Sequence, residues 1–380
     1  MSAPAGRPAA QGAGADDAAQ DGTTQGATVQ DSTVRDTTAA ADGTVADATA
    51  AGVTAAPDLR GVGIVVVNYG SSALLRGNIA DDLRAAGAQV HVVDNDSGAD
   101  ERRAVRELAR ERGWSLLELD NVGFGAGMNA GVDAARAAGA DTLLLLNPDA
   151  SVTAPDLALL VASTRAEPLT MRSPLIVAPD GRMQFRGSQV LVREGRTRAA
   201  DGSDPALEDA WLAGTVVVLT VELWDAIGGF DDEYFLYWED VDLSWRCSAA
   251  GGRLLVDTRV RAVHDGGGTQ TTAHPQAKSP TYYYWNCRNR LLFAARHLGP
   301  RDRVRWALRT PGYAVEVLLR GGRRQLLHPV APVGAVVRGS FAGLRVLVTR
   351  PGSRPGPLPA PGAVTASSDP RRTTPWQPGP

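Results

Sequence analysis

The chain has 380 residues, of which 43% are hydrophobic and 21% charged, and its formal net charge is −3. This composition is sufficient for one large packed domain or two smaller ones, and a charge so near neutral argues against a general nucleic-acid-binding protein. Cys247 and Cys287 lack metal-site spacing, and we recognise no secretory signal at the start. We therefore expect a reducing, cytoplasmic setting with both thiols in the core.

Both ends of the chain differ in composition from the middle. Residues 1–57 are rich in Ala, Gly, Thr and Asp, without aromatic residues or apolar periodicity, and the segment after residue 350 is rich in Pro and Gly. Such segments bury too little apolar surface to offset their conformational entropy, so we predict disordered tails at 1–57 and 351–380. Between them we expect a main domain at 58–298 and a basic helical extension at 299–350.

The main domain begins with alternating strand and helix patterns. We predict strands at 62–67, 89–93, 114–119 and 142–146, alternating with helices at 71–86, 100–112 and 125–138. This alternation indicates an α/β fold with a mostly parallel sheet and helices on both faces. The strands end in Asn68, Asp94, Asn121 and Asp149, and ligands of open α/β sheets bind at such ends.

The pattern is less regular after Asp149. A helix at 155–166 precedes short strands at 175–177, 183–185 and 189–192, and a longer strand is expected at 211–220. Then follow helices at 221–227 and 239–250, strands at 253–256 and 260–264, and a long helix at 281–298.

The C-terminal extension is strongly basic. Residues 301–350 contain ten arginines and only two acids, Asp302 and Glu316, which favours an anionic partner such as membrane lipid or, alternatively, a solvated basic face. The apolar stretch after Pro329 is interrupted by Arg338 and Arg345, so we expect any membrane contact to be peripheral.

Two motifs near the strand ends suggest different chemistries. Gly125, Gly127 and Ala130 satisfy the G-x-G-x-x-G/A pattern of dinucleotide-binding proteins, which leaves an NAD(P)-dependent oxidoreductase as an alternative function. Asp149 follows Pro148 directly after a buried strand, as a carboxylate ligand of Mg²⁺ or Mn²⁺ does, although a simple Asn-Pro-Asp turn has the same pattern. His264 is either a structural histidine or a second ligand of that metal.

Taken together, the motifs VVVNYGS, VVDNDSG, NVGFGAGMNAG, LLLNPDA, YFLYWEDVDLSWR and HDGGGT resemble glycosyltransferase family 2, in particular its bacterial rhamnosyltransferase-like branch. The resemblance covers about residues 61–298. It implies a GT-A fold, a nucleotide-sugar donor, a divalent metal and inversion at the anomeric carbon.

The resemblance also assigns residues. It implies that Asp94 accepts a hydrogen bond from the ring N–H of uracil or thymine and that Asp149 binds the metal, with Asn147 where many members carry an acid. The nucleotide pocket would be lined by Val67, Asn68, Tyr69, Asp94, Asn121, Gly123, Phe124 and Asn129.

The cluster YFLYWEDVDLSWR supplies the expected catalytic base. Asp240 matches the family's base position, and aromatic neighbours would raise its proton affinity by desolvation. We expect Tyr237, Trp238 and Glu239 to bind the acceptor, although Glu239 could instead favour the helix dipole. Asp242 is placed to pair with Arg246, and Trp245 to lie in the core. Arg288 and Arg290 are candidates for a diphosphate contact or for a helix surface.

The sequence thus predicts an inverting, metal-dependent glycosyltransferase that transfers rhamnose from dTDP-rhamnose to a hydroxyl of a cell-wall or polysaccharide acceptor linked to a polyprenyl diphosphate. It would work in the cytoplasm, in peripheral contact with the inner face of the membrane. A UDP-sugar donor and a catalytically inactive protein of the same fold are the alternatives.

Overall fold

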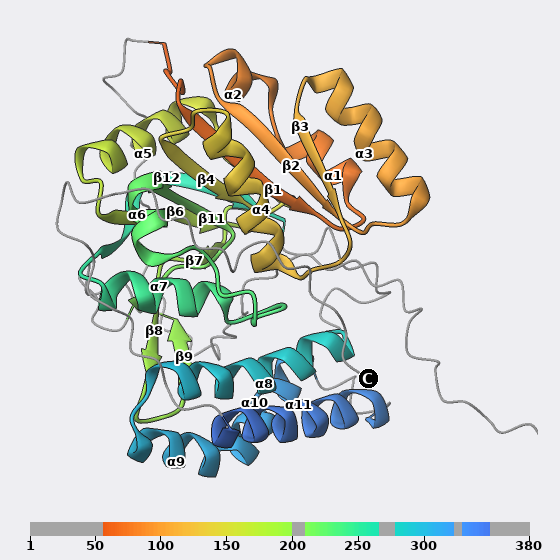
Figure 1. The fold of residues 1–380 in the computed structure, drawn as a ribbon, viewed down its shortest axis with the longest axis vertical. Helices are drawn as coiled ribbons and strands as arrows, with labels where there is room; N and C mark the ends of the chain where they lie inside the picture. Colours follow the sequence, from red (N-terminus) through yellow and green to blue (C-terminus); the bar gives the residue numbers. More distant parts are fainter. Residues whose placement is uncertain (1–55, 200–209, 266–277, 323–328, 350–380) are drawn as a thin grey trace, which may run out of the picture.

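The computed structural model describes residues 56–199, 210–265, 278–322 and 329–349 (Figure 1). The expected tails lie outside these ranges, except for Ala56 and Pro57. A central sheet with flanking helices forms the upper part of Figure 1, and a layer of helices lies below it. The α/β class expected from the sequence, with a C-terminal helical part, is confirmed.

The sheet begins with the four strands that the alternation predicts. β1 (Val62–Asn68), β2 (Gln89–Asn95), β3 (Ser115–Leu119) and β4 (Thr142–Leu146) are parallel in the order β3-β2-β1-β4. The carboxyl ends of β1, β2 and β4 therefore meet at one edge. Asp149 follows β4 after a short turn, immediately before β5 (Ala150–Ser151).

The second half of the sheet mixes directions. β11 (Val216–Thr220) runs antiparallel between β4 and β6 (Thr170–Val177), and β12 (Arg253–His264) continues the sheet parallel to β6. β7 (Met183–Phe185) pairs with β6, while β8 (Ser188–Leu191), β9 (Arg196–Ala199) and β10 (Ala210–Trp211) form a separate small sheet. The end of β12 pairs antiparallel with β5, so His264 lies beside Ala150.

Both faces of the sheet are covered. Alternate residues of β1 enter two apolar clusters: Val65 and Val67 in one, Ile64 and Val66 in the other. The helices in this part are α1 (Ser72–Asn78), α2 (Asp81–Ala85), α3 (Ala99–Arg112), α4 (Phe124–Ala137), α5 (Ala154–Ala166), α6 (Val221–Ile227) and α7 (Glu239–Ala249). Burial on both faces explains why the parallel strands are continuous apolar runs.

Several expected boundaries differ from the structure. The helix expected at 71–86 is broken into α1 and α2, because buried Ile79 and the following Ala80 are extended. The strand expected at 211–220 is divided into β10 and β11, and the two expected at 253–264 are one strand with an irregular register between Asp257 and Arg261. In each case tertiary contacts decided a boundary that local pattern left undetermined.

The lower layer consists of α8 (Pro280–His297), α9 (Pro300–Leu308), α10 (Thr310–Arg320) and α11 (Val330–Thr349) (Figure 1). α11 packs along α8. A Cβ at Gly339 would collide with the backbone of Tyr284, and one at Gly343 would lie 3.0 Å from the carbonyl oxygen of Arg288. The two glycines, four residues apart, thus let the helices approach closely.

Candidate active site

The ends of β1 and β2 carry a closed network of polar side chains. Asn68 Nδ2 donates to Asp94 Oδ1 (3.2 Å), and Arg102 Nε donates to Asp94 Oδ2 (2.8 Å). Ser97 Oγ also donates to Asp94, and Asn68 Oδ1 accepts from Ser71 Oγ (2.7 Å). Asp94 and Asn68 are both fully buried. The carboxylate of Asp94 accepts three hydrogen bonds and has capacity for one more, but its burial means that a pyrimidine N–H could reach it only after local rearrangement.

Asn95, which sequence reasoning missed, organises the neighbouring loop. Its side-chain oxygen accepts from Val122 N (3.1 Å), and its amide donates to Gly123 O (3.1 Å) and to Asn121 Oδ1 (3.3 Å). Asn121 Oδ1 also accepts from Gly123 N. Of the remaining expected nucleotide residues, Val67 and Phe124 are buried and Tyr69 is half-buried beside this edge. The VVDNDSG motif gave the signal, because Asn95 directly follows Asp94.

The glycines of α4 have packing partners inside the protein. A Cβ at Gly125 would lie 3.0 Å from Phe230 Cβ, and one at Gly127 would lie 3.2 Å from Val67 Cγ2. Gly131 in the same way faces Val65 and Val93. Close approach of α4 to β1 and to the segment after α6 accounts for these glycines without a dinucleotide, so the glycine pattern does not by itself favour the oxidoreductase alternative.

A strained turn precedes α7. Tyr237 (φ 65°) and Trp238 (φ 74°) are two consecutive residues in the left-handed region, which costs free energy for side chains other than glycine. Asn289 of α8, fully buried, donates to Leu236 O (2.9 Å) and Tyr237 O (2.8 Å), and Phe124 N donates to Phe235 O (2.9 Å). Contacts from α8 and α4 therefore hold the turn that delivers Glu239 and Asp240.

Asp240 lies in the first turn of α7, next to Gly214. Its Oδ2 accepts from Gly214 N (3.1 Å), and its Oδ1 accepts from Val241 N (2.8 Å). Burial raises the pKa of Asp240 to about 6, and these two backbone N–H groups limit the rise. Thr215, the next residue after Gly214, accepts from Asn147 N (2.9 Å), so the chain connects the surroundings of Asp240 to the Asn147–Asp149 turn.

The other two acids of α7 have different surroundings. Burial and the neighbouring Asp240 raise the pKa of Glu239 well above its ordinary value, and its Oε2 has no hydrogen-bond partner among the described residues. For Asp242, burial raises the pKa, but Arg246 and His297 outweigh it and lower the pKa to about 2. Asp242 accepts from Arg246 Nε (2.7 Å), so the expected i,i+4 pair is present.

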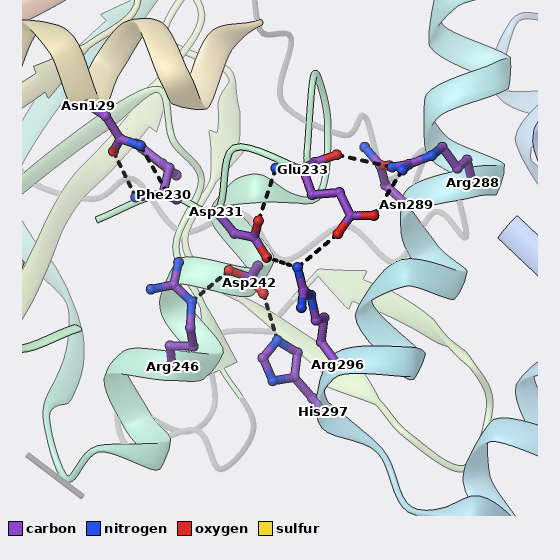
Figure 2. A network of polar contacts seen from close by, with 10 residues as sticks. All are labelled: Asn129, Phe230, Asp231, Glu233, Asp242, Arg246, Arg288, Asn289, Arg296 and His297. Atoms are coloured by element: carbon purple, nitrogen blue, oxygen red, sulfur yellow. Dashed lines mark hydrogen bonds and ion pairs between the residues drawn. The ribbon is translucent and has the colours of Figure 1, made fainter. Parts of the chain in front are cut away.

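A polar network fixes the segment after α6 against α8 (Figure 2). Asp242 contacts His297 Nε2 (2.6 Å), Arg296 bridges Asp231 (3.1 Å) and Glu233 (2.8 Å), and Arg288 reaches Glu233 Oε1 (3.3 Å). These charges lie at a half-buried interface, where hydrogen-bonded pairing offsets their desolvation. The network holds α7 and its preceding turn in one orientation.

Figure 2 also shows what Asn129 does. Its amide donates to Phe230 O (3.0 Å), and its oxygen accepts from Phe230 N (2.9 Å). The same amide also donates to Asp232 Oδ1 (2.7 Å). The expectation that Asn129 lines the nucleotide pocket is corrected accordingly: its polar atoms are used to hold the segment after α6.

Two aromatic residues and one arginine that were candidates for ligand contacts are buried inside the protein. Trp238 is fully buried against Phe293 and Trp306, so it has no face open to an acceptor. Tyr237 is nearly as buried and packs edge-on against Tyr282. Fully buried Arg290 donates to Gly195 O (2.5 Å) and Trp306 O (3.1 Å), and burial lowers its pKa to about 10, so it does not meet a diphosphate.

The two cysteines lie in the core, as expected, and Trp245 is half-buried at its margin. Trp245 packs against Phe293, with ring centroids 5.2 Å apart, and Cys247 and Cys287 are buried and unpaired. Burial raises the pKa of Cys247 to about 12 and that of Cys287 to about 11, so neither thiol is reactive near neutral pH.

Asp149 and His264, far apart in the sequence, meet at the pairing of β5 with β12. Asp149 Oδ1 lies 3.3 Å from His264 Nε2, both side chains are buried, and Asp265 N donates to Asp149 O (3.0 Å). Neither Asp149 Oδ1 nor His264 Nε2 has a hydrogen-bond partner among the residues that the structure describes. The expected association of these two residues is thus present.

Gln184 of β7 determines which nitrogen of the neutral His264 imidazole carries the proton. Its Nε2 donates to His264 O (3.0 Å), so its Oε1 is left to accept from His264 Nδ1 (2.8 Å). A neutral His264 then carries its proton on Nδ1 and presents the Nε2 lone pair to Asp149. Two facing buried acceptors fit a divalent cation. No local signal marked Gln184, because its partner is 80 residues away.

Two ligands alone do not complete a metal site. Within the described ranges, no group of three or more His, Cys, Asp or Glu side chains is placed to hold a metal ion. Mg²⁺ and Mn²⁺ sites of this kind commonly use one or two protein ligands together with substrate phosphates and water. The pair is consistent with a metal that binds together with a phosphorylated ligand.

Comparison with known proteins supports a relation to glycosyltransferases. No family model matches the chain. N-acetylglucosaminyl-diphospho-decaprenol L-rhamnosyltransferase of Mycobacterium tuberculosis, in strains CDC 1551 and H37Rv, is 26% identical over 280 residues, covering 65% of this chain and 88% of the relative. The resemblance read from the motifs, to rhamnosyltransferases of glycosyltransferase family 2, is thereby confirmed.

Similar solved structures include GalNAc-T7 with UDP, GalNAc and Mn²⁺ (TM-score 0.43, 16% identity), of which the chain spans 44% while 54% of this chain is covered. Another is S. aureus TarS 1-349 (TM-score 0.41, 14% identity), with 75% of this chain and 91% of that chain covered. These likenesses are too distant to assign a donor, an acceptor or a metal.

Proposed function

We propose that this chain is an inverting, metal-dependent glycosyltransferase that transfers a sugar from a nucleotide-sugar donor to an acceptor hydroxyl. The observation that carries the proposal is that two sites are joined through the protein: Asp240, with a pKa of about 6, and the buried Asp149–His264 pair. Asp240 accepts from Gly214 N, and the next residue, Thr215, accepts from Asn147 N at the turn that carries Asp149. The related rhamnosyltransferase supports the same reaction class.

In the proposed reaction, Asp240 is the general base. The acceptor oxygen forms a bond to the anomeric carbon as the bond from that carbon to the nucleoside diphosphate breaks on the opposite face. Asp240 takes the hydroxyl proton, and the diphosphate leaves with the bonding electron pair. A pKa near 6 suits this role, because the carboxylate is ionised at neutral pH yet more basic than an exposed aspartate.

We assign Asp149 and His264 as metal ligands, with Gln184 orienting the imidazole. A bound Mg²⁺ or Mn²⁺ would supply positive charge to the departing diphosphate. The remaining ligands would come from the donor phosphates and water, since the described residues offer no third protein ligand.

For the donor and acceptor we propose dTDP-rhamnose and a glycan intermediate linked to a polyprenyl diphosphate. The name of the related M. tuberculosis enzyme supports the sugar and the acceptor, since it describes transfer of L-rhamnose to N-acetylglucosaminyl-diphospho-decaprenol. The dTDP part of the donor rests on the resemblance of the motifs. Such an acceptor would place the protein in the cytoplasm, at the inner face of the membrane. Within the nucleotide pocket we keep Asn68, Asp94 and Asn121, with Val67, Tyr69, Gly123 and Phe124 as its walls.

A donor panel tests the proposal. The melting temperature and the rate of donor hydrolysis are measured with dTDP-, UDP- and GDP-sugars, each with Mg²⁺ or Mn²⁺, and with NADH as the control for the oxidoreductase alternative. We expect dTDP-rhamnose to raise the melting temperature most, because a ligand that binds only the folded state stabilises it. A larger shift with UDP-sugars would indicate a UDP-sugar donor. A shift with GDP-sugars alone would contradict the placement of a pyrimidine nucleobase against Asp94.

A further inference from the structure

The outer surface of the C-terminal layer is unusually apolar. Of twelve exposed large hydrophobic residues in the described part of the chain, nine lie on α9, α10 and α11. The most exposed are Val330 (86%), Val348 (84%), Leu308 (77%) and Phe341 (70%), and all of these except Leu308 lie on α11. Single exposed apolar residues are ordinary, but their concentration on consecutive helices marks an interaction surface.

On α11 these residues form one stripe. The exposed members are Val330, Val333, Val337, Phe341 and Val348. At about 100° per residue they fall within an arc of roughly 80°. Arg338 and Arg345, both exposed and seven residues apart, lie along one margin of the stripe. An apolar stripe with cationic side chains at its margin is the pattern of a helix that lies in the surface of a membrane.

The charges indicate what covers the stripe. α11 contains no Asp or Glu, and the acids of α9 and α10, Asp302 and Glu316, are already paired with Arg305 and Arg320. A second copy of this surface would therefore bring arginines together without free carboxylates to meet them. Anionic lipid head groups would pair with Arg338 and Arg345, whose aliphatic stems reach from apolar surface to phosphate.

The packing of α11 decides how it would meet the lipid. The helix is long and apolar enough to span a membrane by length and composition, and 28% of its apolar stretch is buried. Its opposite face, with Gly339 and Gly343, is in close backbone contact with α8. α8 carries Arg288, Asn289, Arg290 and His297, so a spanning α11 would draw buried polar groups into the hydrocarbon. The stripe thus fits a helix lying in the membrane plane.

We infer that the α11 stripe is a docking surface for anionic membranes, with Phe341 inserted among the acyl chains and Arg338 and Arg345 at the head groups. The docking does not depend on the transfer chemistry, but its purpose rests on the proposed function, since it would bring the active site to a lipid-linked acceptor.

The test is vesicle co-sedimentation of the full chain without any nucleotide sugar, using phosphatidylcholine vesicles with and without 30 mol% phosphatidylglycerol. We expect binding to the anionic vesicles, and at least a tenfold fall in the partition coefficient for Phe341→Asp, because a buried phenyl ring is lost and a charge is added. Arg338→Glu/Arg345→Glu should remove the preference for anionic vesicles.

Matched variants separate the surface from general effects. Phe341→Leu should bind within about twofold of the native chain, since most of the apolar area remains. Arg103→Glu/Arg110→Glu, on exposed positions of α3, makes the same charge change elsewhere and should leave binding intact. Each variant is checked for an unchanged melting temperature.

Native binding equal to that of Phe341→Asp would overturn the inference, as would native binding to neither vesicle. A native dimer that Phe341→Asp dissociates in sedimentation equilibrium would assign the stripe to self-association instead. Because no sugar is present, these results are independent of the donor panel.

Discussion

At the scale of single residues, the proposed chemistry depends on Asp240. Its carboxylate is held by two backbone N–H groups, yet burial keeps its pKa near 6. Burial and the neighbouring Asp240 also raise the pKa of Glu239. With a pKa of about 6, Asp240 is ionised at neutral pH, as the proposed general base has to be.

Asp240→Asn should lower the transfer rate about 10²–10⁴-fold, the usual contribution of a general base. Donor affinity by calorimetry should stay unchanged. A raised folded-state pKa means that ionising Asp240 opposes folding as the pH rises through about 6. The variant should consequently melt no lower than the native protein at pH 7.5. An active Asn variant would remove Asp240 from the base role.

The pH dependence of kcat/KM follows from the same group. Below pH 6 the protonated acid cannot take a proton, so kcat/KM should fall about tenfold per pH unit, with a plateau above pH 7. The profile is measured from pH 4.5 to 8 with saturating metal. A flat profile through pH 6 would contradict the assignment.

A substitution of Gln184 tests the proposed metal site while both assigned ligands, Asp149 and His264, are kept. Gln184→Ala removes the hydrogen bond to His264 Nδ1, so the imidazole ring is no longer held in one orientation. The Mn²⁺ concentration for half-saturation should rise about 10–100-fold, measured by electron paramagnetic resonance in the presence of donor. Gln189→Ala, a half-buried residue of β8, is the matched control. Equal Mn²⁺ affinity for both variants, or full transfer activity in excess EDTA, would contradict the assigned site.

At the scale of elements, the decisive feature is the turn into α7. Two left-handed residues, Tyr237 and Trp238, are kept in place by Asn289 from α8 and by the start of α4. Strained backbone persists only where its surroundings determine it. The position of Asp240 therefore depends on a helix that begins about 40 residues later in the chain.

Asn289→Ala should lower kcat more than tenfold with little change in donor KM, because the turn loses two hydrogen bonds while the nucleotide residues keep theirs. Stability should fall by about 1–3 kcal/mol, the cost of leaving buried acceptors unpaired. Asn286→Ala, on the same helix, is the control: Asn286 is equally buried but donates to Tyr282 O within α8. Asn286→Ala should lower stability and leave kcat unchanged. Equal losses of kcat in both variants would mean that Asn289 has only a structural role.

At the scale of the whole molecule, the C-terminal helices are part of the main fold. One buried cluster contains Trp238, Phe293, Trp306, Tyr313 and Leu347, and so runs across the boundary expected at residue 298. Arg290 adds to this connection through its bonds to Gly195 O and Trp306 O.

We therefore expect one cooperative transition in calorimetry of the full chain. A chain ending at Leu298 should lose that transition, because it exposes the apolar face of α8, whereas a chain ending at Arg350 should keep it. Two separate transitions, or donor binding by the chain ending at Leu298, would show that 58–298 folds independently.

Much of this protein is determined locally by its sequence. Apolar runs ending in Asn68, Asp94 and Asn147 define the first strands, and the Gly228 cap ends α6 at the expected residue. These features depend on neighbours in the chain, so periodicity and turn chemistry reveal them. The assignment of Asp149, His264 and Asp240 as site residues comes from the motifs and the resemblance they carry, and it stays a prediction.

Only the tertiary structure decided how the remaining residues are used. Burial removed Trp238 and Arg290 from the site, and the hydrogen bonds of Asn129 assigned it to packing. Asn95, Gln184 and Asn289 entered it through partners that include residues 26 to 80 positions away. A polar side chain has the same sequence signature whether it binds a ligand or the protein itself, because its partner is chosen by the fold.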